Sequence, residues 1–148
     1  MTQEDKELLI KDLSARLPYG VKAYMKKWSK LDRKYYEGVY TVESVHPSLN
    51  DIYGSTENGS VEVILGYSDY DIKPYLFPLS SMTEEQKNDC PISETNLNII
   101  KSNIGYGIIE MPWRLSYLFV DWCNKNHFDY RGIIPMGIAI DATGLNIY

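Results

Sequence analysis

Polar side chains that could carry acid–base chemistry gather in the stretch His-Phe-Asp-Tyr-Arg-Gly at 127–132. A histidine, a carboxylate and a guanidinium this close together could transfer a proton or bind an anion. The same residues also suit a structured turn, in which Asp129 accepts backbone N–H groups, Arg131 pairs with an acid and Gly132 adopts an unusual dihedral angle. We favour the turn, because the sequence contains no phosphate-binding loop, dinucleotide fingerprint or zinc-protease motif. The candidate polar cluster consists of His127, Asp129, Tyr130 and Arg131.

Cys123 and His127 offer a second possibility, a thiolate nucleophile activated by an imidazole. They lie four apart near the end of a predicted helix, so they could meet on one helix face. Cys123 belongs to the apolar side of that helix, however, and burial raises the pKa of a thiol and reduces its reactivity. We therefore expect a core cysteine and a histidine that caps the helix. Because the chain has only two cysteines and two histidines, we predict no metal site and no cofactor.

Basic and aromatic residues are interleaved over 22–36, where a partner could bind. Lysines beside stacking rings suit single-stranded nucleic acid, an acidic protein partner, or simply a solvated sheet face. The net charge of −5 opposes general nucleic-acid binding, which depends on neutralising phosphates. The predicted partner-binding residues are Lys22, Tyr24, Lys26, Lys27, Trp28, Arg33 and Tyr35.

Capping residues and apolar spacing predict an N-terminal helix over 3–16. Thr2 can cap this helix with Asp5 three residues on, and Leu9 and Leu13 belong to an apolar stripe at helical spacing. Ser81 or Thr83 is expected to cap a short helix, and residues 83–86 match a capping box. A weaker helix is expected over 94–102.

The helix predicted over 112–126 has apolar residues around most of its circumference. Pro112 suits its first turn. A helix of this composition is usually buried on two sides, so we expect it at the centre of the core.

Strand patterns dominate the first half of the chain after the N-terminal helix. Residues 21–28 alternate between apolar and polar side chains, and 35–45 and 61–66 are rich in strand-forming residues. A helix over 21–34 is the alternative, because the lysines and the leucine of that stretch also suit a helix. Pro74 and Pro78 are expected to exclude a central strand over 72–82. We predict an α+β fold: a small antiparallel β-meander or SH3-like barrel, flanked by the N-terminal helix and a buried helix in the C-terminal half.

Length and composition indicate an ordinary globular protein. The 148 residues fit a single domain over 1–148, with 44% hydrophobic and 24% charged residues. The longest strongly apolar stretch, around 115–120, is too short to span a membrane. The acidic start does not resemble a secretory signal, so we expect a cytoplasmic protein of unknown oligomeric state.

Three blocks of the sequence carry a resemblance: Arg-Leu-Pro-Tyr-Gly-Val-Lys at 16–22, the segment 72–83, and 121–132. In this order they resemble short proteins of phage, prophage and mobile regions of gut bacteria, a group with no assigned activity. The resemblance implies an accessory gene product and assigns no functional residue. The stretch 91–111 and the tail after Asp141 have no counterpart in that group.

The function that we predict is a non-catalytic protein-binding module, an accessory protein of a phage or mobile element with an unknown target. One alternative is a nucleic-acid-associated regulator that uses the basic and aromatic face at 22–36. A second alternative is an enzyme centred on His127, Asp129 and Arg131.

Overall fold

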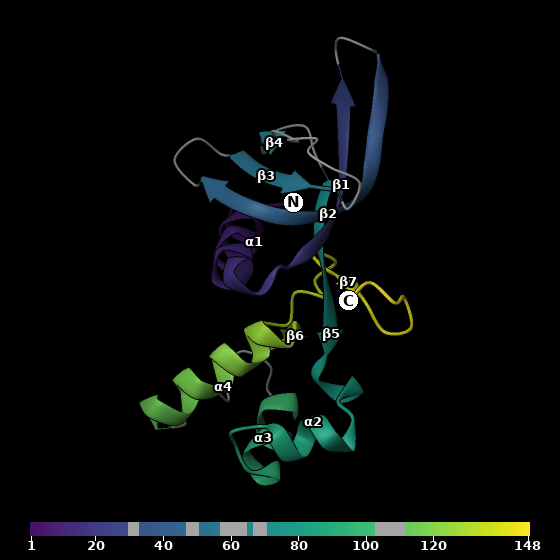
Figure 1. Cartoon of the computed structure of the whole chain (residues 1–148). Coiled ribbons are helices and arrows are strands. Elements are labelled where there is room, and N and C mark those ends of the chain that lie inside the picture. Colours follow the sequence, from purple (N-terminus) through teal and green to yellow (C-terminus); the bar gives the residue numbers. More distant parts are fainter. Residues whose placement is uncertain (30–32, 47–50, 57–64, 67–70, 103–111) are drawn as a thin grey trace.

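A computed structural model describes residues 1–29, 33–46, 51–56, 65–66, 71–102 and 112–148. For residues 27–29, 51, 65–66 and 71 it describes the backbone only. The helices are α1 (Gln3–Arg16), α2 (Glu84–Asp89), α3 (Glu94–Ser102) and α4 (Trp113–Lys125), with short 3-10 turns η1 (Leu17–Tyr19) and η2 (Leu79–Ser81). The strands are β1 (Lys22–Ser29), β2 (Lys34–His46), β3 (Asp51–Ser55), β4 (Leu65–Gly66), β5 (Asp71–Pro78), β6 (Phe128–Asp129) and β7 (Ile140–Asp141). The predicted α+β class is confirmed (Figure 1).

The strands form an open, mostly antiparallel sheet. Along the described strands the order is β4-β3-β2-β1-β5-β6, and β7 pairs with β5. The first four strands make the predicted antiparallel meander, whereas β5 pairs in parallel with both β6 and β7. The end strands of this path do not pair with each other, so the alternative of an SH3-like barrel is wrong. Of the strand predicted over 61–66, only β4 falls within the described residues.

Both predicted capping boxes are confirmed. Thr2 accepts a hydrogen bond from the backbone of Asp5, whose carboxylate accepts one from the Thr2 backbone. Thr83 and Gln86 make the same reciprocal pair at the start of α2. These contacts satisfy N–H groups that a helix start would otherwise leave unbonded.

The segment with two prolines is a strand inside the sheet, contrary to expectation. β5 lies between β1 on one side and β6 and β7 on the other. Pro74 is tolerated because it occupies the last paired position with β1, whereas pairing with β7 begins at Tyr75. Pro78 is the final residue of the strand. Both prolines, which lack an N–H group, therefore occupy positions where hydrogen-bonded strand pairing ends.

The core consists of two hydrophobic clusters. The sheet cluster packs α1 and the 133–139 segment against the strands, and its buried members include Leu13, Met25 and Leu76. The helix cluster joins α3, α4 and β6 through residues such as Ile100, Phe119 and Phe128. In Figure 1, α1 lies beside the sheet, and α2, α3 and α4 lie together at the other end of the molecule.

Helix α4 exists where it was expected, but its predicted central burial is wrong. Phe119 and Cys123 are fully buried on one side, whereas Trp113 and Tyr117 are 83% and 66% exposed. Apolar residues cover most of the helix, yet neighbouring elements cover only the side that faces the helix cluster. Sequence periodicity shows which side chains are apolar and not which of them find a partner.

Candidate functional site

The predicted partner-binding residues other than Arg33 lie on β1 and β2 and are brought together by strand pairing. Lys22 pairs with Thr41, Tyr24 with Val39, and Lys26 with Glu37. Side chains of paired residues share one face of a sheet. We call this set the outer face, because the alternate residues of β1, Ala23 and Met25, enter the core on the opposite side. The outer face comprises Lys22, Tyr24, Lys26, Tyr35, Glu37, Val39 and Thr41.

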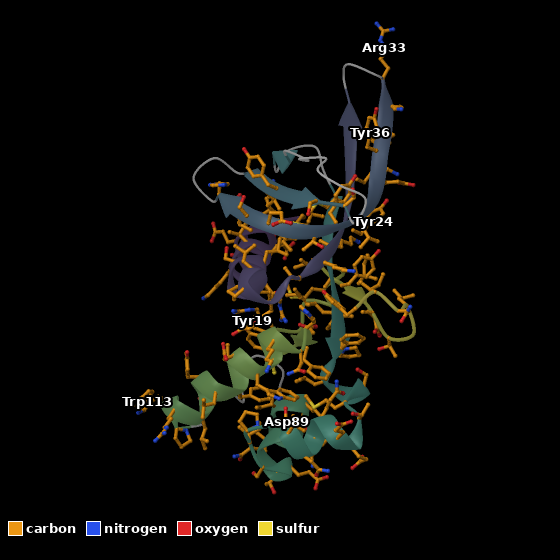
Figure 2. The ribbon with its side chains drawn as sticks, viewed as in Figure 1. Tyr19, Tyr24, Arg33, Tyr36, Asp89 and Trp113 are labelled. Carbon is orange, nitrogen blue, oxygen red and sulfur yellow. The ribbon has the colours of Figure 1, made fainter. Side chains whose placement is uncertain are left out.

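The structure describes less of the other predicted partner-binding residues, which are Lys27, Trp28 and Arg33. The backbones of Lys27 and Trp28 pair with Tyr36 and Tyr35, but their side chains lie outside the described residues. Arg33 is exposed just before β2, with a left-handed φ of 51°. Figure 2 shows its side chain at the outermost end of the strand pair.

The outer part of the two strands projects beyond the sheet as a two-stranded ribbon. β5 pairs with β1 as far as Lys26, and β3 pairs with β2 from Thr41 onward. We call residues 26–29 and 34–40 the β1–β2 ribbon; Figure 1 shows it extending away from the helices. Tyr35, Tyr36 and Val39 of this ribbon are 59%, 40% and 39% exposed, whereas Tyr40 at its inner end is buried.

Charge on the outer face is compensated rather than uniformly basic. The Lys26 ammonium lies 3.2 Å from the Glu37 carboxylate, which also accepts a hydrogen bond of 2.8 Å from the Tyr24 hydroxyl. These bonds raise the pKa of Lys26 and lower the pKa of Glu37. Lys26 also lies 5.0 Å from the centre of the Tyr35 ring. On the opposite face of β2, Lys34 lies 4.6 Å from the centre of the Tyr36 ring. Sequence reasoning missed Glu37, because its role depends on the strand register.

An open groove continues from the outer face toward the C-terminal segment. Its volume is about 340 Å³, and it is lined by Lys22, Val39, Thr41, Ser55, Thr56, Asn146 and Ile147. Tyr148 holds this segment in place: its hydroxyl accepts a hydrogen bond from the Lys22 backbone N–H (3.1 Å) and donates one to the Tyr75 carbonyl (2.8 Å). The groove wall is therefore attached to both β1 and β5.

The polar cluster at 127–131 forms the structured turn that the sequence favoured. Asp129 accepts backbone N–H groups from Ile133 and Ile134 at 3.0 and 2.9 Å. Arg131 pairs with the carboxylate of Asp12 at 3.1 Å, and Gly132 has a positive φ of 75°. The carboxylate and the guanidinium of this cluster are thus engaged in holding the chain.

His127 and Cys123 are both buried, and neither carries the charge that a thiolate–imidazolium pair needs. Burial raises the pKa of the Cys123 thiol well above its usual value and lowers the pKa of His127 to about 4. The His127 ring stacks on Tyr148 with ring centres 3.9 Å apart. Its backbone N–H donates to the carbonyl of Asn124, so this residue caps α4 through the main chain. The expected core cysteine is confirmed.

Sequence reasoning also missed a buried ionic junction between α1 and the end of α4. Asp12 and Arg16 are fully buried and form an ion pair of 2.8 Å. The two terminal nitrogens of the Arg16 guanidinium also donate to the carbonyls of Cys123 (3.2 Å) and Phe128 (2.9 Å). The four-residue spacing of the acid and the base on α1 was the available signal. That spacing also occurs in many exposed helix pairs, so it did not reveal burial.

No group of three or more histidine, cysteine, aspartate or glutamate residues in the described part of the chain is arranged to hold a metal ion. Across the same ranges, no helix has the length and apolar character needed to cross a membrane. In comparisons with protein-family models, curated proteins and solved structures, the chain shows no significant match.

Proposed function

We propose that the chain is a non-catalytic protein-binding module whose β1–β2 ribbon contacts the partner. The observation that carries this proposal is the exposure of Tyr35, Tyr36 and Val39 on a ribbon that projects from the sheet. Aromatic side chains supply large contact areas at protein interfaces and are enriched there. Arg33 at the end of the ribbon adds a second residue type that interfaces favour.

Charge pairing favours a protein partner over nucleic acid. Glu37 engages Lys26 in the middle of the outer face, and it would repel a phosphate backbone that approached the same place. The overall charge of −5 acts in the same direction. A protein surface with mixed charge can match alternating lysine and glutamate, whereas a polyanion cannot.

The contacts around 127–131 argue against the enzyme alternative at that cluster. Catalysis would need an accessible base or acid, whereas His127 is 8% exposed and Asp129 is 2% exposed. Both oxygens of Asp129 accept backbone N–H groups.

We further propose a cytoplasmic accessory role for a phage or mobile element. The phage or mobile-element origin is supported by the three sequence blocks that resemble proteins of such elements. The free cysteines Cys90 and Cys123 are typical of a reducing compartment and support the location.

A pull-down from a bacterial lysate, with and without nuclease, tests the proposed function. We expect a protein that the chain retains after nuclease treatment, that a Tyr35→Ala variant loses, and that Met136→Ala keeps. Met136 is a suitable control because it is 52% exposed and lies outside the β1–β2 ribbon. Nuclease-sensitive binding would instead support the regulator alternative. Protein binding that survives Tyr35→Ala and Tyr36→Ala together would contradict the ribbon as the partner face.

A further inference from the structure

The segment that follows β7 is held mainly at its two ends. At one end Ala142 is 1% exposed, and its backbone N–H donates to the carbonyl of Leu76 at 2.8 Å. At the other end Tyr148 bonds to both β1 and β5, and Figure 1 shows the end marked C beside β5 and β7. The residues between these two anchors are exposed or half-buried. We call residues 143–148 the strap.

The hydroxyl of Tyr148 lies where the next hydrogen bond between β1 and β5 would form. Pairing of these strands ends at Ala23 and Pro74. In the same register, Lys22 stands opposite Tyr75. The Tyr148 hydroxyl accepts the Lys22 backbone N–H (3.1 Å) and donates to the Tyr75 carbonyl (2.8 Å). A hydroxyl group can accept and donate at once, so it bridges the two strands.

The same two backbone groups could bond to each other directly. Carbonyls point alternately to the two sides of a strand. The Leu76 carbonyl points toward β7, where it accepts the N–H of Ala142, so the Tyr75 carbonyl points toward β1. If the hydroxyl withdraws, a small approach of β1 to β5 brings Lys22 N–H to this carbonyl at about 2.9 Å. Two arrangements of the strands therefore satisfy both groups.

The ring of Tyr148 occupies a site that other elements build. It stacks on His127, with ring centres 3.9 Å apart and planes 10° apart, and its centre lies 5.9 Å from that of Phe77. The Phe77 backbone N–H donates to the His127 carbonyl at 2.9 Å, which holds these two residues together without the strap. Tyr148 remains 41% exposed, so solvent reaches one side of the residue.

The backbone of the strap favours release. Asn146 has a left-handed φ of 49°, a conformation that costs more for asparagine than for glycine. The strap regains freedom around this residue when Tyr148 leaves its site. Segments with few buried side chains open at the lowest free energy, and the strap has this character.

We propose that the strap is a releasable element of the fold and that Tyr148 is its latch. In the latched state the phenol hydroxyl bridges β1 and β5. In the released state Lys22 bonds directly to Tyr75 and the strap leaves the sheet. Asn146 and Ile147 line the groove, so release removes one of its walls. The latch rests on its own contacts, whereas an effect of release on partner access rests on the proposed function.

Nuclear magnetic resonance of Tyr148→Ala tests the released state. We expect a scalar coupling across a hydrogen bond between the Lys22 nitrogen and the Tyr75 carbonyl carbon, which the wild-type chain lacks. Residues 143–147 should lose their order. The melting temperature should fall by less than about 5 °C, because the direct bond replaces the bridge. A fall of about 10 °C or more without this coupling would show that Tyr148 is an ordinary packing residue, which overturns the latch.

Relaxation dispersion of the wild-type chain tests whether it visits the released state. We expect the amides of Lys22 and of the strap to exchange with a minor state whose chemical shifts agree with those of Tyr148→Ala. Tyr148→Phe keeps the ring and loses both hydroxyl bonds, so it should raise the released population about tenfold. Tyr117→Phe, which alters an exposed tyrosine of α4, is the matched control and should leave that population unchanged.

Two results of this second measurement would overturn the latch. One is a wild-type strap without a minor state. The other is a released population that is the same in Tyr148→Phe as in the wild-type chain, because the hydroxyl bridge would then hold nothing. Both measurements use the chain alone, so failure of the latch is observed separately from failure of the proposed partner binding.

Discussion

At the scale of single residues, His127 occupies an environment that differs strongly from water. It is 8% exposed, it stacks on Tyr148, and its Nδ1 atom is buried without a hydrogen-bond partner among the described residues. Arg16 lies near enough to oppose a positive charge on the ring, and the more weakly acting Asp12 favours it. Burial is the largest of these influences, and the folded state therefore holds the imidazole neutral.

This environment predicts that stability depends on the protonation of His127. Its pKa is about 4 in the folded chain, below the ordinary value of 6.5. Between these pH values the unfolded chain binds one proton more than the folded chain. The stability that the neutral His127 ring contributes is therefore complete above about pH 6.5 and is lost as the pH falls toward 4. The full loss is about 3 kcal/mol of unfolding free energy. Urea unfolding at a series of pH values measures it.

The control for this prediction is His127→Phe, which keeps an aromatic ring against Tyr148 and cannot be protonated. Carboxylates with lowered pKa, such as Asp5 and Glu84, also reduce stability in acid and do so equally in both proteins. The difference between the two pH profiles therefore isolates the histidine. Parallel profiles over pH 4 to 6.5 would show that burial of His127 does not perturb its titration.

At the scale of elements, the contact between β2 and β3 depends on a glycine. A Cβ atom at Gly54 would lie 3.0 Å from the Thr41 carbonyl oxygen and 3.1 Å from the Tyr40 Cβ. Neither of these atoms can move without shifting β2. A register irregularity between Val42 and Ser44 lies in the same part of the strand pair. Close backbone approach of this kind is a common reason for glycine inside a strand.

Gly54→Ala is therefore expected to destabilise the fold by about 1–3 kcal/mol, because strand β2 must shift to admit the methyl group. Gly38→Ala is the matched control on β2, where the nearest atom is a Tyr40 ring carbon at an ordinary 3.6 Å. That change should be neutral or stabilise by about 0.5 kcal/mol, since alanine loses less backbone entropy than glycine. Thermal unfolding compares the two variants; an equal effect on both would contradict the close contact at Gly54.

Local patterns predicted most elements, because the physics that fixes them acts over a few residues. The Thr2 and Thr83 capping boxes and the alternation of Val21, Ala23 and Met25 were all read from neighbouring residues and are confirmed. The errors concern long-range pairing. Whether Pro74 can stand inside a sheet depends on where β1 and β7 begin and end, and a local pattern does not contain that information.

The candidate site was predictable only in part for the same reason. The residues of β1 were found from their alternation, but Glu37 joins them through the register of β1 and β2. Asp12 and Arg16 were recognisable as a helical ion pair. Their burial depends on Cys123 and Phe128, which lie more than 100 residues away along the chain. Tyr148 likewise acts through backbone groups of Lys22 and Tyr75.

At the scale of the whole molecule, two hydrophobic clusters are joined by buried polar contacts. The sheet cluster includes Leu9 and Leu13 of α1, and the helix cluster includes Phe119 and Cys123 of α4. Arg16, the last residue of α1, donates a hydrogen bond to the carbonyl of Cys123 and so connects the sheet cluster to the helix cluster. A single domain over 1–148 remains a prediction, and it requires these clusters to unfold together.

Arg16→Met tests whether this junction couples the two clusters. The change fills a similar volume but leaves the carbonyls of Cys123 and Phe128 and part of Asp12 without their donor, at a cost of about 3 kcal/mol. Because α1 stays packed on the sheet, we expect hydrogen exchange to accelerate more in α4 than in β1. Lys87→Met removes the exposed pair with Glu84 and should change stability by less than about 1 kcal/mol. If exchange instead accelerates equally in α4 and β1, the two clusters form one cooperative unit through contacts other than Arg16.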